Sequence, residues 1–106
     1  MGRETFTGQL DLLLLAALRD EERHGYAVIE HVRDTSAGRF DYAEGTVYPA
    51  LRRMEDDGLI KSRWSDNSGR RRRLYRLTAS GRRALRVREE DWASFRSGIE
   101  AVISGA

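Results

Sequence analysis

The arginines of this 106-residue chain are clustered, and this clustering predicts a surface that binds negatively charged groups. Four arginines are consecutive at Arg70–Arg73, and the segment from Lys61 to Arg76 holds seven basic residues and one acid. That segment carries a net charge of +6 whereas the whole chain carries +2, so the remainder of the chain is net −4. A basic segment concentrated on an acidic body is a directed electrostatic footprint rather than a general aid to solubility.

The other reactive residue types argue against an enzyme. There are no cysteines, and therefore neither a disulfide framework nor a thiolate metal site. His24 and His31 lie seven residues apart without a third ligand at a suitable spacing, which makes a poor zinc site. The 17 acids are scattered, apart from the cluster Glu55-Asp56-Asp57, and no glycine-rich phosphate loop is present. We therefore expect no catalytic residue, no metal and no cofactor.

A short helix over about residues 44–57 is the first element predicted to present basic side chains. Val47, Leu51 and Met54 fall at i, i+4 and i+7 and therefore share one helical face. Arg52 and Arg53 lie beside that face and point outward. Gly58 follows where a helix needs a residue that tolerates positive φ, so it predicts the C-terminal cap.

Two starts are compatible with this helix. If Thr46 caps it, Pro49 lies in the first turn, where a missing N–H costs nothing. If the helix begins nearer Ala43, Pro49 removes a hydrogen bond to Gly45 and bends the first turn.

A β-hairpin over residues 60–77 is predicted to carry the arginine run. Residues 60–65 alternate, with Ile60 and Trp64 on one face, and residues 72–77 alternate again after turn residues at 66–69. A two-stranded hairpin alone is marginal in water. We therefore expect it to pack on the helices through Ile60, Trp64 and Leu77.

Three further helices complete the predicted fold. Residues 10–18 are apolar nearly all round, residues 24–33 form a second helix after a charged turn at 19–23, and Thr78 caps a last helix that runs to about Ile103. The last helix carries apolar residues and one arginine at a three-four spacing. Both apolar helices need covering, either by the chain's own core or by a second copy. We predict a homodimer whose interface comprises Leu12, Leu13, Leu85, Trp92, Phe95, Ile99 and Val102.

The predicted fold class is mainly α with a small β-hairpin (α+β), arranged as a winged helix-turn-helix with a long C-terminal dimerisation helix. Residues 1–77 form the expected winged-helix DNA-binding domain, with the wing at 60–77, and residues 78–106 form the dimerisation helix. The apolar stretch 10–18 is too short to span a bilayer, so we expect no membrane association and a cytoplasmic protein.

Three motifs in this order resemble the PadR family of bacterial transcriptional regulators. They are His-Gly-Tyr at 24–26, Gly-Thr-Val-Tyr-Pro-Ala-Leu-Arg-Arg-Met-Glu at 45–55 followed by Gly-Leu-Ile at 58–60, and Arg-Arg-Leu-Tyr-Arg-Leu-Thr at 72–78 with Gly81. The resemblance covers nearly the whole chain and is closest to the short subgroup with a single C-terminal helix. It departs at Ala43, where the family often carries a serine as the helix cap.

The resemblance implies a dimeric repressor that binds a palindromic DNA operator and is released by a small molecule or another signal. The helix at about 44–57 would enter the major groove, where Arg52 or Arg53 would bridge a guanine, and the wing would contact flanking phosphates. A flat aromatic effector would lie between the subunits against Trp92. A winged-helix module that binds only proteins is the alternative, although it would not need an arginine-rich wing. The implied DNA contacts are His24, Tyr26, Thr46, Tyr48, Arg52, Arg53, Arg70, Arg71, Arg72 and Arg73.

Overall fold

The structure is a computed structural model that describes residue 6 and residues 8–67 and 69–105. Within these residues the chain forms four α-helices and three β-strands, which confirms the predicted α+β class. In chain order the elements are α1 (Gln9–Ala17), β1 (Arg23–His24), α2 (Gly25–Thr35), α3 (Glu44–Asp56), β2 (Ile60–Asn67), β3 (Arg70–Leu77) and α4 (Ala79–Ser104).

One hydrophobic core joins the helices to the base of the sheet. Helix α1 packs against α2 and α4, and α2 packs against α3. A nine-residue helix is marginal by itself, so α1 depends on this burial, in which Leu14 and Leu15 become fully inaccessible. Its Leu12 and Leu13 remain half-buried. The fully buried side chains are Leu14, Leu15, Leu18, Val28, Val47, Leu51, Met54 and Ile60.

Helix α3 begins at the earlier of the two predicted starts. Its N-cap is Ala43, which has extended dihedral angles and makes no side-chain capping bond, and Pro49 therefore lies inside the helix. Gly58 adopts φ +79°, as predicted for the C-terminal cap. The Leu59 N–H donates to the Met54 carbonyl at 2.9 Å, which closes the last turn in a Schellman-type motif.

The wing is confirmed as an antiparallel hairpin of β2 and β3, with Ile60 opposite Leu77 at its base and Asn67 opposite Arg70 at its tip. Of the predicted turn residues, Ser68 lies outside the described residues. The predicted turn at 19–23 is wrong at its end, because Arg23 and His24 form strand β1 and pair with Tyr75 and Leu74. The sheet order is therefore β1-β3-β2.

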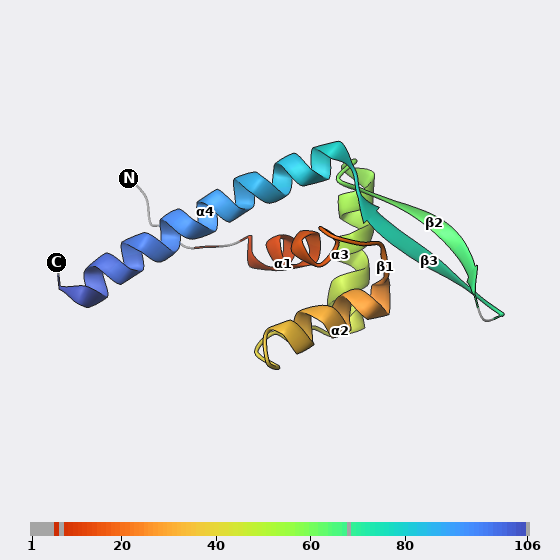
Figure 1. Ribbon diagram of the computed structural model, residues 1–106, viewed down its shortest axis with the longest axis horizontal. Helices are drawn as coiled ribbons and strands as arrows, with labels where there is room; N and C mark the ends of the chain where they lie inside the picture. Colours follow the sequence, from red (N-terminus) through yellow and green to blue (C-terminus); the bar gives the residue numbers. More distant parts are fainter. Residues whose placement is uncertain (1–5, 7, 68, 106) are drawn as a thin grey trace.

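Trp64 does not pack on the helices as predicted. It shares a strand face with Ile60, yet it is 52% exposed whereas Ile60 is 1% exposed. The reason is its position along the hairpin, which extends away from the helices beyond its base (Figure 1). At the base of the hairpin Ile60 and Leu77 are buried as predicted, and Tyr75 is buried with them.

Helix α4 begins at the predicted cap, since the Thr78 hydroxyl accepts a hydrogen bond from the Gly81 N–H at 3.0 Å. Its 26 residues span about 39 Å. The first turns pack on the body, where Leu85 is only 3% exposed. Leu85 was predicted as a dimer contact, but its own chain already covers it, so the prediction is corrected to core packing.

The molecule is elongated because α4 and the wing project in opposite directions (Figure 1). Its radius of gyration is 15.7 Å, whereas a compact chain of this length has about 13 Å. The far end of α4 therefore leaves apolar side chains without cover from the chain's described residues, among them Val102 at 80% and Ile103 at 78% exposure.

Candidate nucleic-acid interface

A groove of about 320 Å³ lies between the wing and the facing ends of α2 and α3. It brings together residues that lie up to about fifty positions apart in the sequence, with aromatic rings on its helical side and arginines on its wing side. Its lining residues are His24, Gly25, Tyr26, Tyr48, Trp64, Arg71, Arg72, Arg73 and Tyr75. A basic wall with exposed aromatic and hydroxyl groups is a surface suited to a phosphate backbone.

Gly25 allows Tyr48 to reach this groove. The Tyr48 ring packs so close to the start of α2 that a Cβ at position 25 would lie 2.3 Å from the ring carbon Cε1. Burial against α2 is also the main reason why the pKa of the Tyr48 hydroxyl lies above its ordinary value. The hydroxyl therefore stays protonated at neutral pH and is available as a hydrogen-bond donor.

His24 anchors the wing to α2. Its Nδ1 lies 3.1 Å from the Arg73 carbonyl oxygen. Since a carbonyl can only accept, Nδ1 carries the proton and donates this bond. His24 is also the N-cap residue of α2 and a member of β1, so the bond fixes the wing relative to the helix start.

A second surface continues from Tyr48 along the outer side of α3, lined by Tyr48, Pro49, Arg52, Arg53 and Asp56. The two arginines differ in their surroundings. Arg53 donates two hydrogen bonds to Asp11 of α1, at 3.0 and 2.8 Å. Arg52 is exposed and has no carboxylate partner among the described residues. Arg52 is thus the arginine of α3 that is available to a duplex without breaking an ion pair.

Asp11 connects three helices. Besides the bonds from Arg53 of α3, its carboxylate lies 3.7 Å from the Arg88 guanidinium of α4. The hydrogen bond from Arg53 outweighs partial burial and lowers the pKa of Asp11. The carboxylate is therefore charged at neutral pH. In this form its contacts with Arg53 and Arg88 connect the outer side of α3 to α1 and α4.

The wing arginines lie over an aromatic ring. The Arg71 and Arg73 guanidinium carbons are 4.6 and 4.9 Å from the centroid of the Trp64 ring. The Nε of Arg73 also donates to the Ser62 hydroxyl at 3.0 Å, and that hydroxyl donates to Glu55 at 2.7 Å. Glu55, at the end of α3, therefore reaches the wing through one serine.

Part of the wing's charge is balanced within the chain. Arg63 donates to Glu22 at 3.0 Å, and this hydrogen bond lowers the pKa of Glu22. Arg63 lies on the opposite strand face from Trp64. The face that carries Trp64, Arg71 and Arg73 also carries one acid, Asp66, which lies opposite Arg71 in the strand register, so the two arginines leave that face net positive.

The structure brings six of the predicted DNA contacts into the groove: His24, Tyr26, Tyr48, Arg71, Arg72 and Arg73. Arg52 and Arg53 lie on the adjoining surface of α3, Thr46 is exposed in the first turn of α3, and Arg70 lies at the wing tip. Sequence reasoning missed the roles of Gly25, Glu55, Ser62 and Asp11. Gly25 and Glu55 had a signal, because they stand inside the motifs at 24–26 and 45–55, whereas Ser62 and Asp11 had none.

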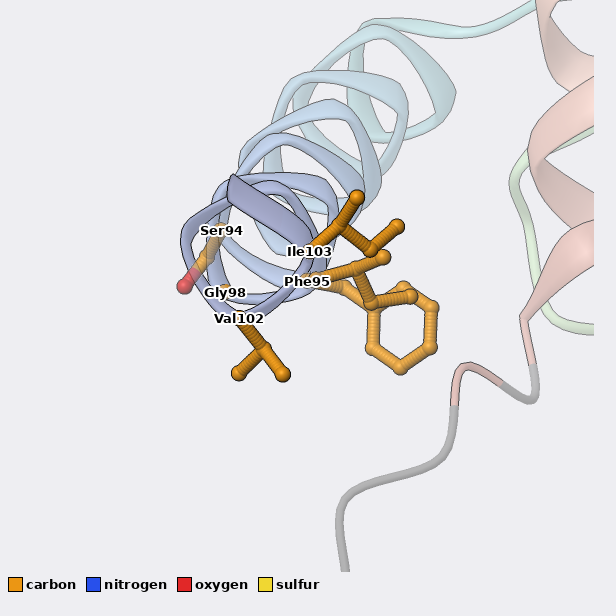
Figure 2. Close-up of a pocket in the computed structure, with 6 residues that line it drawn as sticks. Ser94, Phe95, Gly98, Val102 and Ile103 are labelled. Carbon is orange, nitrogen blue, oxygen red and sulfur yellow. The ribbon is translucent and has the colours of Figure 1, made fainter. Parts of the chain in front are cut away.

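A separate apolar groove of about 520 Å³ follows the far end of α4. In Figure 2, which looks along the helix, Phe95 and Ile103 lie on one side, Val102 lies below the helix, and Ser94 points to the other side. Closer to the body, the Trp92 ring packs edge-on against Phe6, with centroids 5.3 Å apart, and lies 6.1 Å from Phe95. Trp92 remains 39% exposed.

The described part of the chain contains neither a membrane-spanning helix nor a cluster of metal ligands. No helix there is long and apolar enough to cross a membrane. No three histidine or acidic side chains come together there as metal ligands would.

Comparison with known proteins gives one consistent result. The family described as transcriptional regulator PadR-like matches residues 14–87. A transcriptional regulator of Mycobacterium tuberculosis is 37% identical over 83 residues, which are 78% of this chain and 75% of the relative. A PadR family transcription regulator from Clostridium difficile is 34% identical, with a TM-score of 0.80 over 91% of this chain and 99% of the other. A transcriptional regulator from Clostridium thermocellum is 28% identical, with a TM-score of 0.81 over 88% and 91% of the two chains.

Proposed function

The chain belongs to the PadR-like family of transcriptional regulators, which bind DNA, and on that premise we propose that it is a dimeric, ligand-responsive repressor acting on a palindromic operator. In this proposal residues 1–77 bind DNA, residues 78–106 form the dimerisation helix, and the protein acts in the cytoplasm. The groove between the wing and α3 carries the proposal, because it joins the Tyr48 side of α3 to Arg71–Arg73 on one continuous surface.

The proposed division of labour follows from the position of each group. Helix α3 enters the major groove and Arg52 reads a base, since a guanidinium can bridge guanine O6 and N7. The wing arginines and the hydroxyl of Tyr48 contact phosphates, which positions the helix without reading sequence. In a dimer the two α3 helices would lie about 34–36 Å apart, one turn of DNA.

The first experiment is fluorescence anisotropy of the protein on labelled duplexes from upstream of its own gene, with a scrambled duplex alongside and both at two salt concentrations. Tight, salt-sensitive binding to one duplex over the scramble, saturating at two chains per site, is the expected result. Equal weak binding to every duplex would refute operator recognition. No binding to any duplex would favour the alternative, a winged-helix module that binds proteins.

Replacing both Arg70 and Arg71 with alanine tests the role of the wing. Binding to all duplexes should weaken alike, and the slope of log affinity against log salt should flatten by up to about 2, since each lost phosphate contact contributes about 0.9. A loss confined to specific binding would mean that the wing reads bases.

The proposed homodimer uses the half-buried Leu12 and Leu13 of α1 and the apolar end of α4, with Trp92, Phe95, Ile99 and Val102 as its contacts there. Val102 is 80% exposed, so an aspartate there costs a single chain little but would place a charge in the proposed interface. We expect Val102→Asp to shift sedimentation from dimer to monomer, whereas Ser97→Asp, outside the apolar groove, should not. A wild-type protein that sediments as a monomer would refute the dimer.

The proposed effector is a flat aromatic molecule that stacks on Trp92 beside Phe95. Two partly exposed aromatic rings 6.1 Å apart offer such a molecule a stacking surface. Planar aromatic compounds should quench tryptophan fluorescence in the wild type and not in Trp92→Ala. Because Trp64 also fluoresces, quenching that persists in the variant would locate the compound elsewhere.

A further inference from the structure

We propose that Trp64 is a positioning residue for the arginines of the wing, and that it acts chiefly on Arg71. The inference rests on the proposed function, since it concerns how the same groove holds a DNA phosphate backbone. It assigns a role to an exposed tryptophan that the core does not use and that the predicted DNA contacts do not include.

The first observation is that Trp64 is half exposed, so this large apolar side chain gains only part of the burial energy that a core position would give it. It is 52% exposed on β2, directly opposite Arg73 in the strand register. Arg71 and Arg73 both lie over its ring, at 4.6 and 4.9 Å from the centroid. These are the distances of cation–π contacts, in which an indole is the best partner for a guanidinium.

The second observation is that these arginines need positioning. Arg71 and Arg73 occupy the same strand face two residues apart, so their like charges repel and their long side chains sample many rotamers in solution. A ring beneath both guanidinium groups offsets this repulsion and limits the rotamers. The side chains then lose less conformational freedom when they meet a phosphate.

The contacts of the two arginines are unequal, and this makes the proposal specific. Arg73 has a second constraint, because its Nε donates to Ser62, which in turn donates to Glu55. Arg71 makes no side-chain hydrogen bond or ion pair within the described residues, although Asp66 lies opposite it in the strand register, and its close contact is with the ring of Trp64. Removing the ring should therefore release Arg71 more than Arg73.

The test is a double-mutant cycle measured by anisotropy on one duplex. Trp64→Ala should bind the duplex about tenfold more weakly for each wing that contacts it. This loss of affinity corresponds to the loss of two exposed cation–π contacts in each wing. Trp64→Phe should restore most of the affinity, since a phenyl ring keeps a cation–π face. The salt slope should keep its wild-type value in Trp64→Ala, because the same arginines neutralise the same phosphates once bound.

Arg71→Ala should cost clearly less affinity in the Trp64→Ala background than in the wild type. Arg70→Ala is the matched control, because Arg70 lies next in the chain but on the other strand face, opposite Asn67. Its effect should be the same in both backgrounds.

Each other result overturns the proposal in a distinct way. Wild-type affinity in Trp64→Ala would mean that the ring does not help binding. If the double variant loses as much binding free energy as the two single variants, Trp64→Ala and Arg71→Ala, lose together, Trp64 contacts DNA itself. A salt slope that falls together with affinity would mean that the wing has lost its structure. Failure of the wild type to bind any duplex would instead refute the proposed function.

Discussion

Replacing Asp11 with asparagine tests whether one carboxylate holds α3 against α1 and α4. The substitution keeps the size of the side chain and removes its charge. In the wild type that carboxylate accepts hydrogen bonds from Arg53 at 2.8 and 3.0 Å and lies 3.7 Å from Arg88. Its side chain is 15% exposed, so the charge is better shielded from solvent than in most surface ion pairs.

The expected loss of stability follows from these contacts. A hydrogen bond to a charged group contributes about 1.5–3 kcal/mol, but the Arg53 side chain is 52% exposed and solvent screens part of the attraction. We therefore expect Asp11→Asn to lower the free energy of unfolding by about 1–2 kcal/mol. In a domain of this size, a loss of 1 kcal/mol lowers the melting temperature by about 4–8 °C.

The pH dependence has a definite sign. The pKa of Asp11 in the folded chain lies below its ordinary value of 3.8, chiefly because Arg53 donates hydrogen bonds to the charged form. The stabilisation is therefore fully present above about pH 4 and disappears as the pH falls through the lowered pKa. The difference between wild type and Asp11→Asn should be constant at neutral pH and shrink in acid.

The measurement is urea denaturation followed by circular dichroism at about pH 7, about pH 5 and about pH 3, with the chain concentration held constant because dimerisation would add to stability. Asp20→Asn is the matched control, since that side chain is 85% exposed and should change stability by less than about 0.5 kcal/mol. A loss at neutral pH no larger than that of the control would refute the reasoning. So would a loss that persists undiminished in acid.

Three further substitutions test single packing or capping features. Gly25→Ala should leave the melting temperature nearly unchanged, because the Tyr48 ring can swing away from the new Cβ. The displaced ring should weaken DNA binding measured by anisotropy. Wild-type affinity in this variant would mean that Tyr48 is not part of the DNA interface. Ala43→Ser should raise the free energy of unfolding by about 0.5–2 kcal/mol, since the N-cap of α3 lacks a side-chain bond; no gain in urea denaturation would contradict this. Gly81→Ala should destabilise by about 2–3 kcal/mol in the same assay, because its Cβ would lie 2.0 Å from the Leu59 carbonyl oxygen; a wild-type midpoint would show that the backbone yields easily.

Local signals explain why most of the fold could be predicted from the sequence. The cap at Thr78, the positive φ at Gly58 and the alternation about the hairpin turn each depend on residues within a few positions of one another. Such features form wherever the chain carries them, provided that packing does not oppose them. Strand β1 was missed for the opposite reason, since two residues carry no periodicity and become a strand only by pairing with Tyr75 and Leu74.

The sequence by itself determined the order of the elements, the placement of the arginine run on a hairpin and the outward position of Arg52 and Arg53. Only the tertiary structure decided which of these side chains stay available. Arg53 meets a carboxylate 42 residues away, and Leu85 enters the core rather than the outer seam of α4. Trp64 stays outside the core and receives two arginines instead. The physical reason is that ion pairing and burial depend on which surfaces contact each other in the folded chain. The periodicity of a single segment shows which face is apolar but does not identify the segment that packs against it.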